Sequence, residues 1–519
     1  MPLNDTKRDS GEITPNHDPD MNLNDHESQP QPSQTETSEE SEPEPHSIYT
    51  AREKWCIVAL IAFGGLFSPL SSNIYFPVIP TLSEVFHKSI ELINLTVTMY
   101  IVFQGLAPMF WGTLADSYGR RLMFIACLLL LAISCIGLAL VPTNDYWLLL
   151  FLRCFQAAGS ASTIALGAGV IGDISEPAER AGFFGVYNIG PLVGPAIGPV
   201  LGGVLADKLG WRSIFWFLCI ASAACAVVLI LLLPETLRAL VGNGSIPPPG
   251  PPLIARPLLP LIGRRRKNPT QAPLPSRPHK PFRNPLRLLL NLDILILLFF
   301  NGVICAVFYG VNASISTIFH ETYPQLGETE LGLCFLAIGG GMLIGSAGSG
   351  KLLDWDYQRV KRSILAETSE KSEQNYAFPI EQARMRLMPI LVAFYIASCT
   401  GYGWCIEKKV SLAGPLILLI GVGIFSMAVM NATQTLILDL VPGQGSSVTA
   451  CNNLVRCALS ATMVACIQLI LTPLGVGWTY TLLSGMCVAA SPLIYVVMRI
   501  GPGCRAKRRR RSGGGEAIF

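Results

Sequence analysis

The stretch GPLVGPAIGPVLGG, residues 190–203, places glycine and then proline at every fourth position inside an apolar run from about Phe183 to Ala206. Proline lacks a backbone donor and clashes with the preceding turn, so it kinks a helix and frees a carbonyl group. In lipid, a freed carbonyl group must be buried in protein or reached by water. Glycines four residues apart form a groove that another helix can approach closely. We therefore expect a bent, closely packed membrane helix here.

This helix is expected to act as a gate, and the alternative is a helix that only tolerates its kinks. The residues of this gate motif are Gly190, Pro191, Gly194, Pro195, Gly198, Pro199 and Gly202.

The rest of the chain has the composition of a membrane protein. Of its 519 residues, 50% are hydrophobic and 14% are charged, and the mean hydropathy is +0.45. Soluble domains are nearer a quarter charged. Apolar runs of roughly 20 residues, long enough to cross a bilayer, begin near residues 55, 91, 122, 147, 181, 212, 291, 331, 387, 412, 450 and 476. The pattern predicts an all-α polytopic membrane protein with 12 transmembrane helices.

Charge and proline content divide this chain into five parts. We expect two six-helix bundles, residues 55–233 and 291–499, separated by a disordered, basic, proline-rich linker, residues 234–290. An acidic tail, residues 1–54, precedes them, and a basic tail, residues 500–519, follows them. Lysine and arginine gather in the linker, in the last tail and after spans 2 and 8, and cytoplasmic loops carry such an excess. Both termini and the linker are therefore expected to face the cytoplasm.

A repeated motif relates the two bundles. GTLADSYGRR, residues 112–121, follows span 2, and GKLLDWDYQRVKR, residues 350–362, follows span 8. Each places an aspartate four residues after a glycine and an arginine further on. Such repeats are typical of transporters with a substrate site between two related halves. The candidate residues of this cluster are Gly112, Asp116, Gly119, Arg120, Arg121 and Asp354. A plain basic turn at the cytoplasmic surface is the alternative.

Polar residues inside the apolar spans are the candidates for a central site. An intramembrane arginine is costly and faces the bundle interior or a water-filled cavity. We therefore expect Arg153, with Gln156 beside it, and Arg456 to control protonation or the electrostatics of a cavity. The alternative is that they are structural hydrogen-bond hubs. Amides and aromatic side chains suit amphipathic organic substrates, although asparagines also hold helices together. The cavity candidates are Asn73, Tyr100, Gln104, Asn301, Phe308, Asn312, Asn431 and Gln434.

Several function classes lack support in the sequence. There is no phosphate-binding Gly-Lys-Ser/Thr loop, no metal-ligand spacing and no nucleophile with a base, so we expect neither an enzyme nor a cofactor or metal site. The basic residues flank membrane spans, which argues against nucleic acid as a partner. The expected partners are the lipid bilayer, a small organic substrate and protons, and the chain is expected to be a monomer.

The motifs carry a family resemblance. GTLADSYGRR, LRCFQAAGSA at residues 152–161 and GPLVGPAIGPVLGG resemble three signatures of the major facilitator superfamily. NIYFPVIP, WRSIFWF, LPET and DWDYQRVKR resemble the fungal twelve-spanner drug:proton antiporters, especially the quinidine-resistance-like branch. The resemblance implies that the cluster around Asp116 is a latch to the C-terminal half. It also implies that the proline–glycine helix, packed against span 8, seals the outer side of the cavity.

The resemblance also implies a function. We expect a proton antiporter that exports drugs or other small amphipathic compounds across the plasma membrane, with the vacuolar or prospore membrane as the alternative. A dedicated cargo (a polyamine, an organic acid or a spore-wall precursor), facilitated diffusion and a non-transporting receptor stay open. The carboxylates near the spans, Asp116, Asp173, Asp293 and Asp439, all lie near span ends, so proton coupling is implied mostly by the resemblance.

Overall fold

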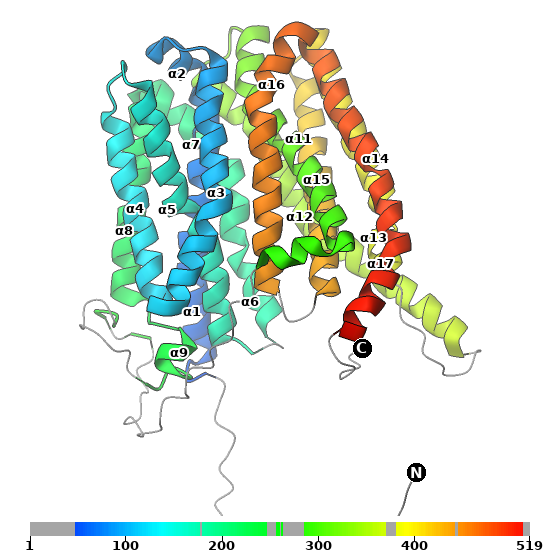
Figure 1. Ribbon diagram of the computed structural model, residues 1–519. Helices are drawn as coiled ribbons and strands as arrows, with labels where there is room; N and C mark the ends of the chain where they lie inside the picture. The colour runs from blue at the N-terminus through cyan, green and yellow to red at the C-terminus, as the bar shows by residue number, and fades with distance from the viewer. Residues whose placement is uncertain are drawn as a thin grey trace, which may run out of the picture. The chain divides into compact units, whose positions relative to one another are not determined.

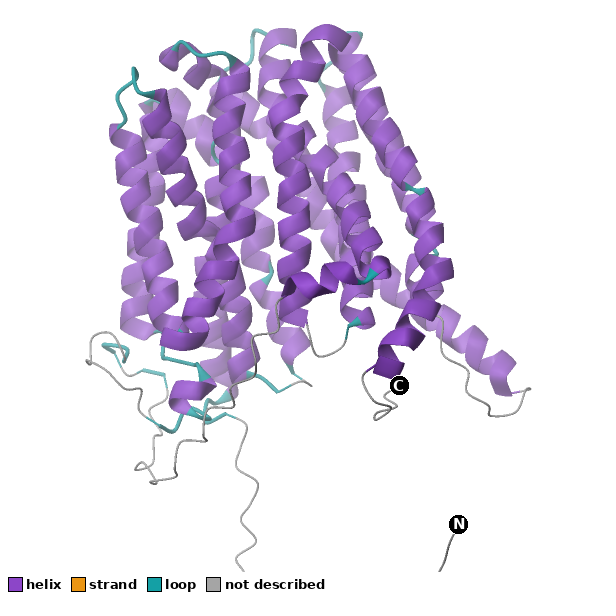
Figure 2. Ribbon diagram, in the orientation of Figure 1, coloured by secondary structure: helices purple, strands orange, loops and turns teal. Residues whose placement is uncertain are grey.

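Apolar runs of this length must be helical in lipid, because no water is present there to satisfy exposed backbone groups. The computed structural model describes residues 47–176, 179–246, 256–259, 261–262, 285–369, 380–441 and 445–511, all within the unit Pro45–Phe519. In these residues the regular structure is entirely helical, as Figure 2 shows. The helices begin within five residues of the expected starts.

The helices form an N-terminal and a C-terminal half (Figure 1). The first half contains α1 (Ala51–Asn73), η1 (Phe76–Val78), α2 (Ile79–Phe86), α3 (Ile90–Tyr118), α4 (Arg120–Leu140), α5 (Tyr146–Ile174), α6 (Arg180–Tyr187), α7 (Ile189–Leu209), α8 (Arg212–Leu232) and α9 (Arg238–Val241). The second contains η2 (Pro285–Leu290), α11 (Leu292–Thr322), α12 (Glu328–Ser369), α13 (Ile380–Met385), α14 (Met388–Glu407), α15 (Ala413–Leu440), α16 (Gly445–Ala490) and α17 (Pro492–Arg511).

Eleven helical runs in the described chain are long and apolar enough to cross a membrane. The last of them, Val448–Lys507, has 60 residues. At 1.5 Å per residue it would span about 90 Å, three times the bilayer core. Its helix breaks at Gly475, whose φ of 72° is left-handed, so the run divides there into two spans. The arrangement is therefore that of six helical spans in each half.

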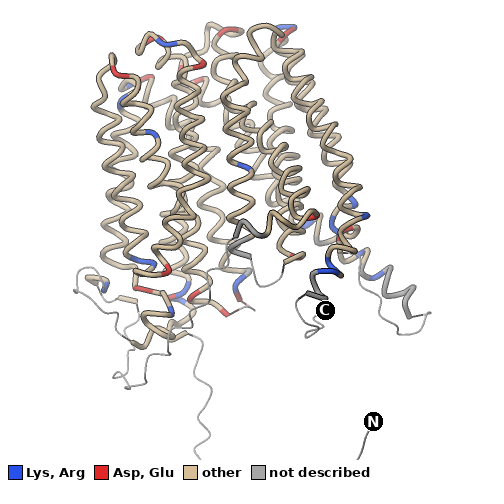
Figure 3. Tube along the Cα trace, in the orientation of Figure 1, with Lys and Arg blue, Asp and Glu red and all other residues tan. Residues whose placement is uncertain are grey.

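The two halves contact each other along two pairs of helices. In Figure 1, α3 lies beside α16 at the front, and α7 packs against α12 behind them. We call these contacts the front seam and the rear seam. The end that carries η1 and α2 is called the η1 end, and the opposite one is the α9 end. Charged residues gather at both ends and are sparse along the middle of the helices (Figure 3), as a membrane environment requires.

The gate motif has a different geometry from the expected one. The helix breaks at Asn188, between α6 and α7, so Pro191 lies in the first turn of α7. First-turn amides have no partner within a helix, so Pro191 breaks no hydrogen bond there. Only Pro195 and Pro199 lie inside the helix.

The glycine row also has a different neighbour from the one expected. Cβ atoms built on Gly190, Gly194, Gly198 and Gly202 would all collide with or press against α1 of the same half. The expected contact of span 5 with span 8 is present as the rear seam, but Ala196, Pro199 and Gly203 form it instead. At ~100° per residue, these two faces of α7 point about 150° apart. A repeat of four residues indicates that a helix packs closely, but it does not specify which neighbour it packs against.

Two expected boundaries also move. The motif at residues 350–362, expected in a loop, lies within α12, which continues to Ser369. Residues 234–246, assigned above to the linker, are described, and Glu235, Thr236, Leu237 and Val241 are buried against the N-terminal half. The N-terminal half therefore extends beyond residue 233.

Candidate functional site

The GTLADSYGRR motif forms a charged cluster at the α9 end. The turn between α3 and α4 is made at Gly119, whose φ is 113°, and Arg120 and Arg121 begin α4. Arg120 pairs with Asp116 at 2.7 Å and, through Nε, with Asp173 of α5 at 3.1 Å. Arg120 is thus paired with two acids of its own half.

A buried carboxylate that the sequence reasoning did not single out holds this turn together. Glu235, from the LPET stretch after α8, accepts hydrogen bonds from the backbone amides of Arg120 and Arg121, at 2.8 and 3.2 Å. It also accepts from the amides of Thr236 and Leu237, both at 3.0 Å. An anion at a helix N-terminus is favoured by the free amides and the helix dipole. Glu235 therefore fastens the end of α8 to the start of α4.

The latch itself is only partly visible. The Asp116 side chain is 64% exposed, and its ion pair with Arg120 lies within its own half. Gly112 lies inside α3, and nothing lies within 4 Å of a Cβ built there, so the turn is made at Gly119 alone. The side chain of Asp354 lies outside the described residues. A latch to the C-terminal half stays a prediction.

In the C-terminal half, ion pairs also occur near the corresponding end of the helices. Arg384 of α13 pairs with Asp439 of α15 at 3.0 Å, and Arg505 of α17 approaches Glu381 of α13 at 3.5 Å. Asp116, Asp173 and Asp439, which were considered above as proton carriers, are therefore all engaged with arginines of their own half.

Arg153 lies at the centre of the N-terminal half and is fully buried. Its guanidinium lies between the rings of Tyr75 and Tyr100, at 4.1 and 4.4 Å from their centroids. Nη1 donates to Gln156 Oε1 at 2.6 Å, and the spacing of three residues places both side chains on one face of α5. Two desolvated cation–π contacts stabilise the charge by about 2 kcal/mol each. This arrangement holds a positive charge inside the half without a carboxylate partner among the described side chains.

Arg456 lies at the front seam, on α16. Nη2 donates to Asn453 Oδ1 at 3.0 Å, and Asn453 Nδ2 donates to the carbonyl oxygen of Gln104 in α3 at 3.1 Å. Close packing surrounds this polar link, since a Cβ on Gly105 would lie 2.9 Å from Cys457 Cβ. A polar chain thus runs from Arg456 across the seam to the N-terminal half.

The cavity candidates divide into separate groups. Tyr100 donates to or accepts from Ser160 at 2.6 Å beneath Arg153, and Gln104 lies at the front seam. Asn301 donates to Asn452 at 2.8 Å, and Asn452 donates to Gln434 at 2.5 Å. This second group links α11, α16 and α15, the structural role that asparagines in spans often have.

The remaining cavity candidates make local contacts. Asn73 and Asn312 donate to carbonyl oxygens one turn back in their own helices, at 2.7 and 2.9 Å. Asn431 donates to Ser349 of α12 at 3.1 Å. Phe308 packs edge-on against Tyr309. The candidates Asn301, Phe308 and Asn312 of α11 therefore do not converge on one polar site through the contacts described.

The η1 end is closed by contacts between the halves. Thr81 of α2 donates to Glu328 of α12, and Thr329 donates to Asp207 of α7 at 2.8 Å. Ser316 of α11 donates to the carbonyl oxygen of Phe76 at 2.7 Å, and the Phe76 ring stacks on Phe335 with centroids 6.2 Å apart. These contacts connect α2, η1 and α7 to α11 and α12.

The sequence match decides which family this architecture represents. Residues 61–465 match the family model described as Major Facilitator Superfamily. The chain belongs to this superfamily. It is therefore a secondary transporter and a multi-pass membrane protein, and not an enzyme.

Relatives of this transporter support the finer resemblance to fungal antiporters. Citrate exporter 1 of Aspergillus niger is 37% identical over 476 residues, which cover 90% of this chain and 89% of the relative. Multidrug transporter QDR2 of Candida glabrata is 34% identical, with 91% and 85% covered. Quinidine resistance protein 1 of Saccharomyces cerevisiae is 32% identical, with 88% and 84% covered. The expected resemblance to the quinidine-resistance-like branch is confirmed.

Solved structures agree on the fold. A bacterial homologue of the lysosomal transporter Spinster has a TM-score of 0.61 at 14% identity and covers 88% of this chain and 99% of its own. A D-xylose–proton symporter has a TM-score of 0.61 at 15% identity, with 85% and 97% covered.

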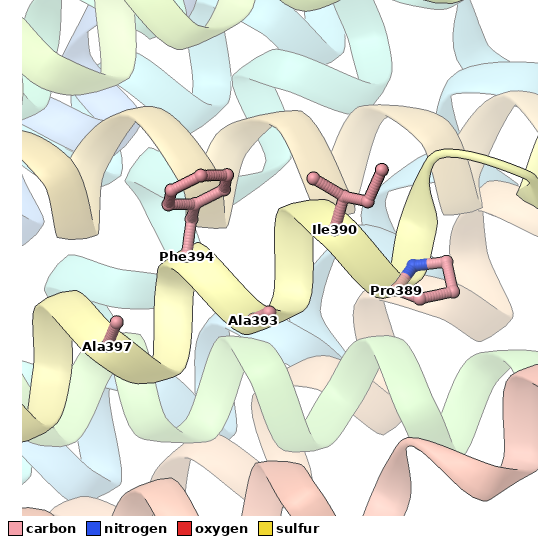
Figure 4. A pocket seen from close by; sticks show the side chains of 5 residues that line it. All are labelled: Pro389, Ile390, Ala393, Phe394 and Ala397. Atoms are coloured by element: carbon pink, nitrogen blue, oxygen red, sulfur yellow. The ribbon is translucent and has the colours of Figure 1, made fainter.

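One hollow on this transporter does not fit a substrate site. It is lined only by Pro389, Ile390, Ala393, Phe394 and Ala397, all on α14 (Figure 4). Ile390 and Phe394 are more than half exposed, as apolar side chains that face lipid tails are.

Proposed function

We propose that the chain exports small organic compounds by proton antiport, through alternating access of a site between its two halves. The observation that carries this proposal is the way the halves meet. Two seams of close helix contact run between them, while a small number of hydrogen bonds and one stacked ring pair close the η1 end. Few bonds have to break for the η1 end to open, while the rest of each half moves as a rigid body.

The relatives support two classes of cargo. Two of them are named as multidrug transporters or resistance proteins, which supports drugs and other amphipathic compounds. The relative named as a citrate exporter supports an organic acid as the second candidate.

We assign proton coupling to Glu328. A coupling carboxylate must change its surroundings when the halves move, and Glu328 accepts a hydrogen bond from Thr81 of the opposite half. The charges that act on it are Asp207 of α7, Glu84 of α2 and His320 of α11. Opening of the η1 end would separate Glu328 from Thr81 and Asp207 and expose the carboxylate to water, with which it can exchange a proton.

The membrane orientation follows from the basic residues. We propose that the α9 end faces the cytoplasm, since lysine and arginine are abundant there, around Arg120, Arg384 and Arg505. The cell membrane that suits an exporter is the plasma membrane. The site proposed above lies between the two halves of one chain, so the proposed functional unit is a monomer.

Flux measurements on the purified full chain in liposomes test the proposal. A pH gradient is imposed, and uptake of radiolabelled citrate and quinidine is followed with and without an uncoupler. Gradient-driven uptake that collapses with the uncoupler supports antiport. Equilibration that ignores the gradient overturns the proton coupling, and the absence of flux with either compound overturns the proposed export of such compounds. Glu328→Gln should retain substrate exchange and lose the response to the gradient, with the exposed Glu330→Gln as its control.

A further inference from the structure

The inference concerns the chemistry of the cargo and rests on the proposed function. Both arginines of the central region carry charges without a carboxylate partner among the described residues. We propose that the site between the halves binds an organic anion with a carboxylate group, and that Arg456 is the residue that contacts it.

Arg456 has donors to spare. Its Nη2 is used by Asn453, while Nε is buried without a hydrogen-bond partner among the described groups. A buried guanidinium donor without a partner is costly, because the group has lost its water without replacement. The residue as a whole is only half-buried, and its helix lies at the front seam, where the two halves meet.

The groups around Arg456 are neutral ones. Cys305 and Tyr309 of α11 and Cys457 of its own helix are the groups that interact with it electrostatically. Four acidic side chains near the helix ends are already engaged: Asp173 and Asp439 pair with arginine, and Glu328 and Asp207 accept from threonine. The charge of Arg456 therefore has no carboxylate partner among the described helices, and an anion from outside the chain would supply one.

Arg153 adds to the same field but does not touch the ligand. It is enclosed by Tyr75 and Tyr100 and has no exposed surface. Tyr309 of α11 interacts electrostatically with both Arg456 and Tyr100, and the Tyr100 ring contacts Arg153, so the two arginines act on the same central region. Two positive charges in a low-dielectric centre attract an anion and repel a cation.

Guanidinium and carboxylate are matched in shape as well as in charge. The planar guanidinium donates two parallel N–H bonds to the two oxygens of a carboxylate, a geometry that a lysine ammonium cannot reproduce. A site of this kind discriminates carboxylates from cationic drugs of similar size, because a cation would leave the Arg456 donors unpaired and add a like charge.

A binding assay on the detergent-purified full chain tests this inference apart from transport. Citrate, quinidine and glucose serve as anionic, cationic and uncharged probes, and ligand-induced thermal stabilisation gives each affinity. We expect wild-type protein to bind citrate. Loss of charge-assisted hydrogen bonds should weaken this binding about 10- to 100-fold in Arg456→Gln. Arg456→Lys should regain part of the affinity.

The control removes one positive charge away from the centre. Lys88→Gln, at an exposed position of the η1 end, should bind citrate as wild type does. Failure of wild-type protein to bind citrate, or equal citrate affinity in Arg456→Gln and wild type, overturns the inference. If Arg456→Gln is misfolded, as shown by a fall in its ligand-free melting temperature, Arg456→Lys decides: citrate affinity equal to that of wild type contradicts the paired geometry. Citrate binding without flux would instead contradict the proposed function and leave the anion site supported.

Discussion

Adding one methyl group to the rear seam should shift the balance between the two states of the transporter. A Cβ on Gly332 would lie 2.5 Å from the carbonyl oxygen of Pro199 and 3.3 Å from the Cα of Gly203, whereas ordinary contact begins at 3.4 Å. In Gly332→Ala, α12 must therefore withdraw from α7 by about 0.9 Å near the η1 end. Overpacking of this kind costs about 1–3 kcal/mol.

The cost applies only while the η1 end is closed, because separation of the helices makes room for the methyl group. The equilibrium between closed and open forms should then move toward the open form roughly 5- to 150-fold, since 1.4 kcal/mol is a factor of ten. Hydrogen–deuterium exchange of the segments 76–86 and 328–335 measures this shift, because opening breaks their contacts. Export should slow, since the return to the closed form becomes unfavourable.

Gly340→Ala is the matched control, with the same substitution in the same helix. Nothing lies within 4 Å of a Cβ built at Gly340, so the only expected effect is a gain of up to about 1 kcal/mol in helix propensity. Equal exchange at the η1 end in the two variants would refute the account of the rear seam.

Three further predictions follow from the charged contacts. Thr81→Val and Glu328→Gln should each raise hydrogen–deuterium exchange at the η1 end. The double variant should add little to either, because both substitutions remove the same hydrogen bond. Fully additive effects would show that the two residues are not coupled. Glu235→Gln should lower the free energy of unfolding by at least about 1.5 kcal/mol, because charge-assisted hydrogen bonds to backbone amides are lost. Glu330→Gln is the control, and equal melting temperatures of the two variants would contradict this prediction. Asp116→Asn should change the free energy of unfolding by less than about 1 kcal/mol, because its ion pair is exposed. The same variant should reduce export if Asp116 is part of the latch. Normal export in vesicles would contradict the latch.

The spans were predictable because their signals are local. A run of apolar residues of bilayer length has few alternatives to a helix, so the starts agree with the structure. Arg153 and Gln156 were found for a similar reason: a charge inside a span is costly, and a spacing of three residues places the amide on the same face.

Partners across space were not predictable in this way. The four-residue spacing of the glycines in α7 correctly predicted close packing against another helix. That this helix is α1 depends on how the six helices of the half are arranged. Glu235 lies in the LPET stretch and Glu328 lies at the start of α12, but neither position indicates which groups its carboxylate binds. Tyr309 is an aromatic residue in an apolar helix, and its importance appears only when Arg456 is seen beside it.

The two faces of α7 also determine the axis about which the halves can turn. One face is packed tightly onto α1, so α7 moves together with its own half, and the opposite face supports α12. The front seam provides the second line of support, at Gly105 and Cys457. The proposed rocking motion, if it is to keep both supports, would turn about a line through the middle of the two seams, parallel to the membrane. Contacts near this axis, such as Gly339 against Ala196, would then persist through the transport cycle, while contacts at either end would alternate.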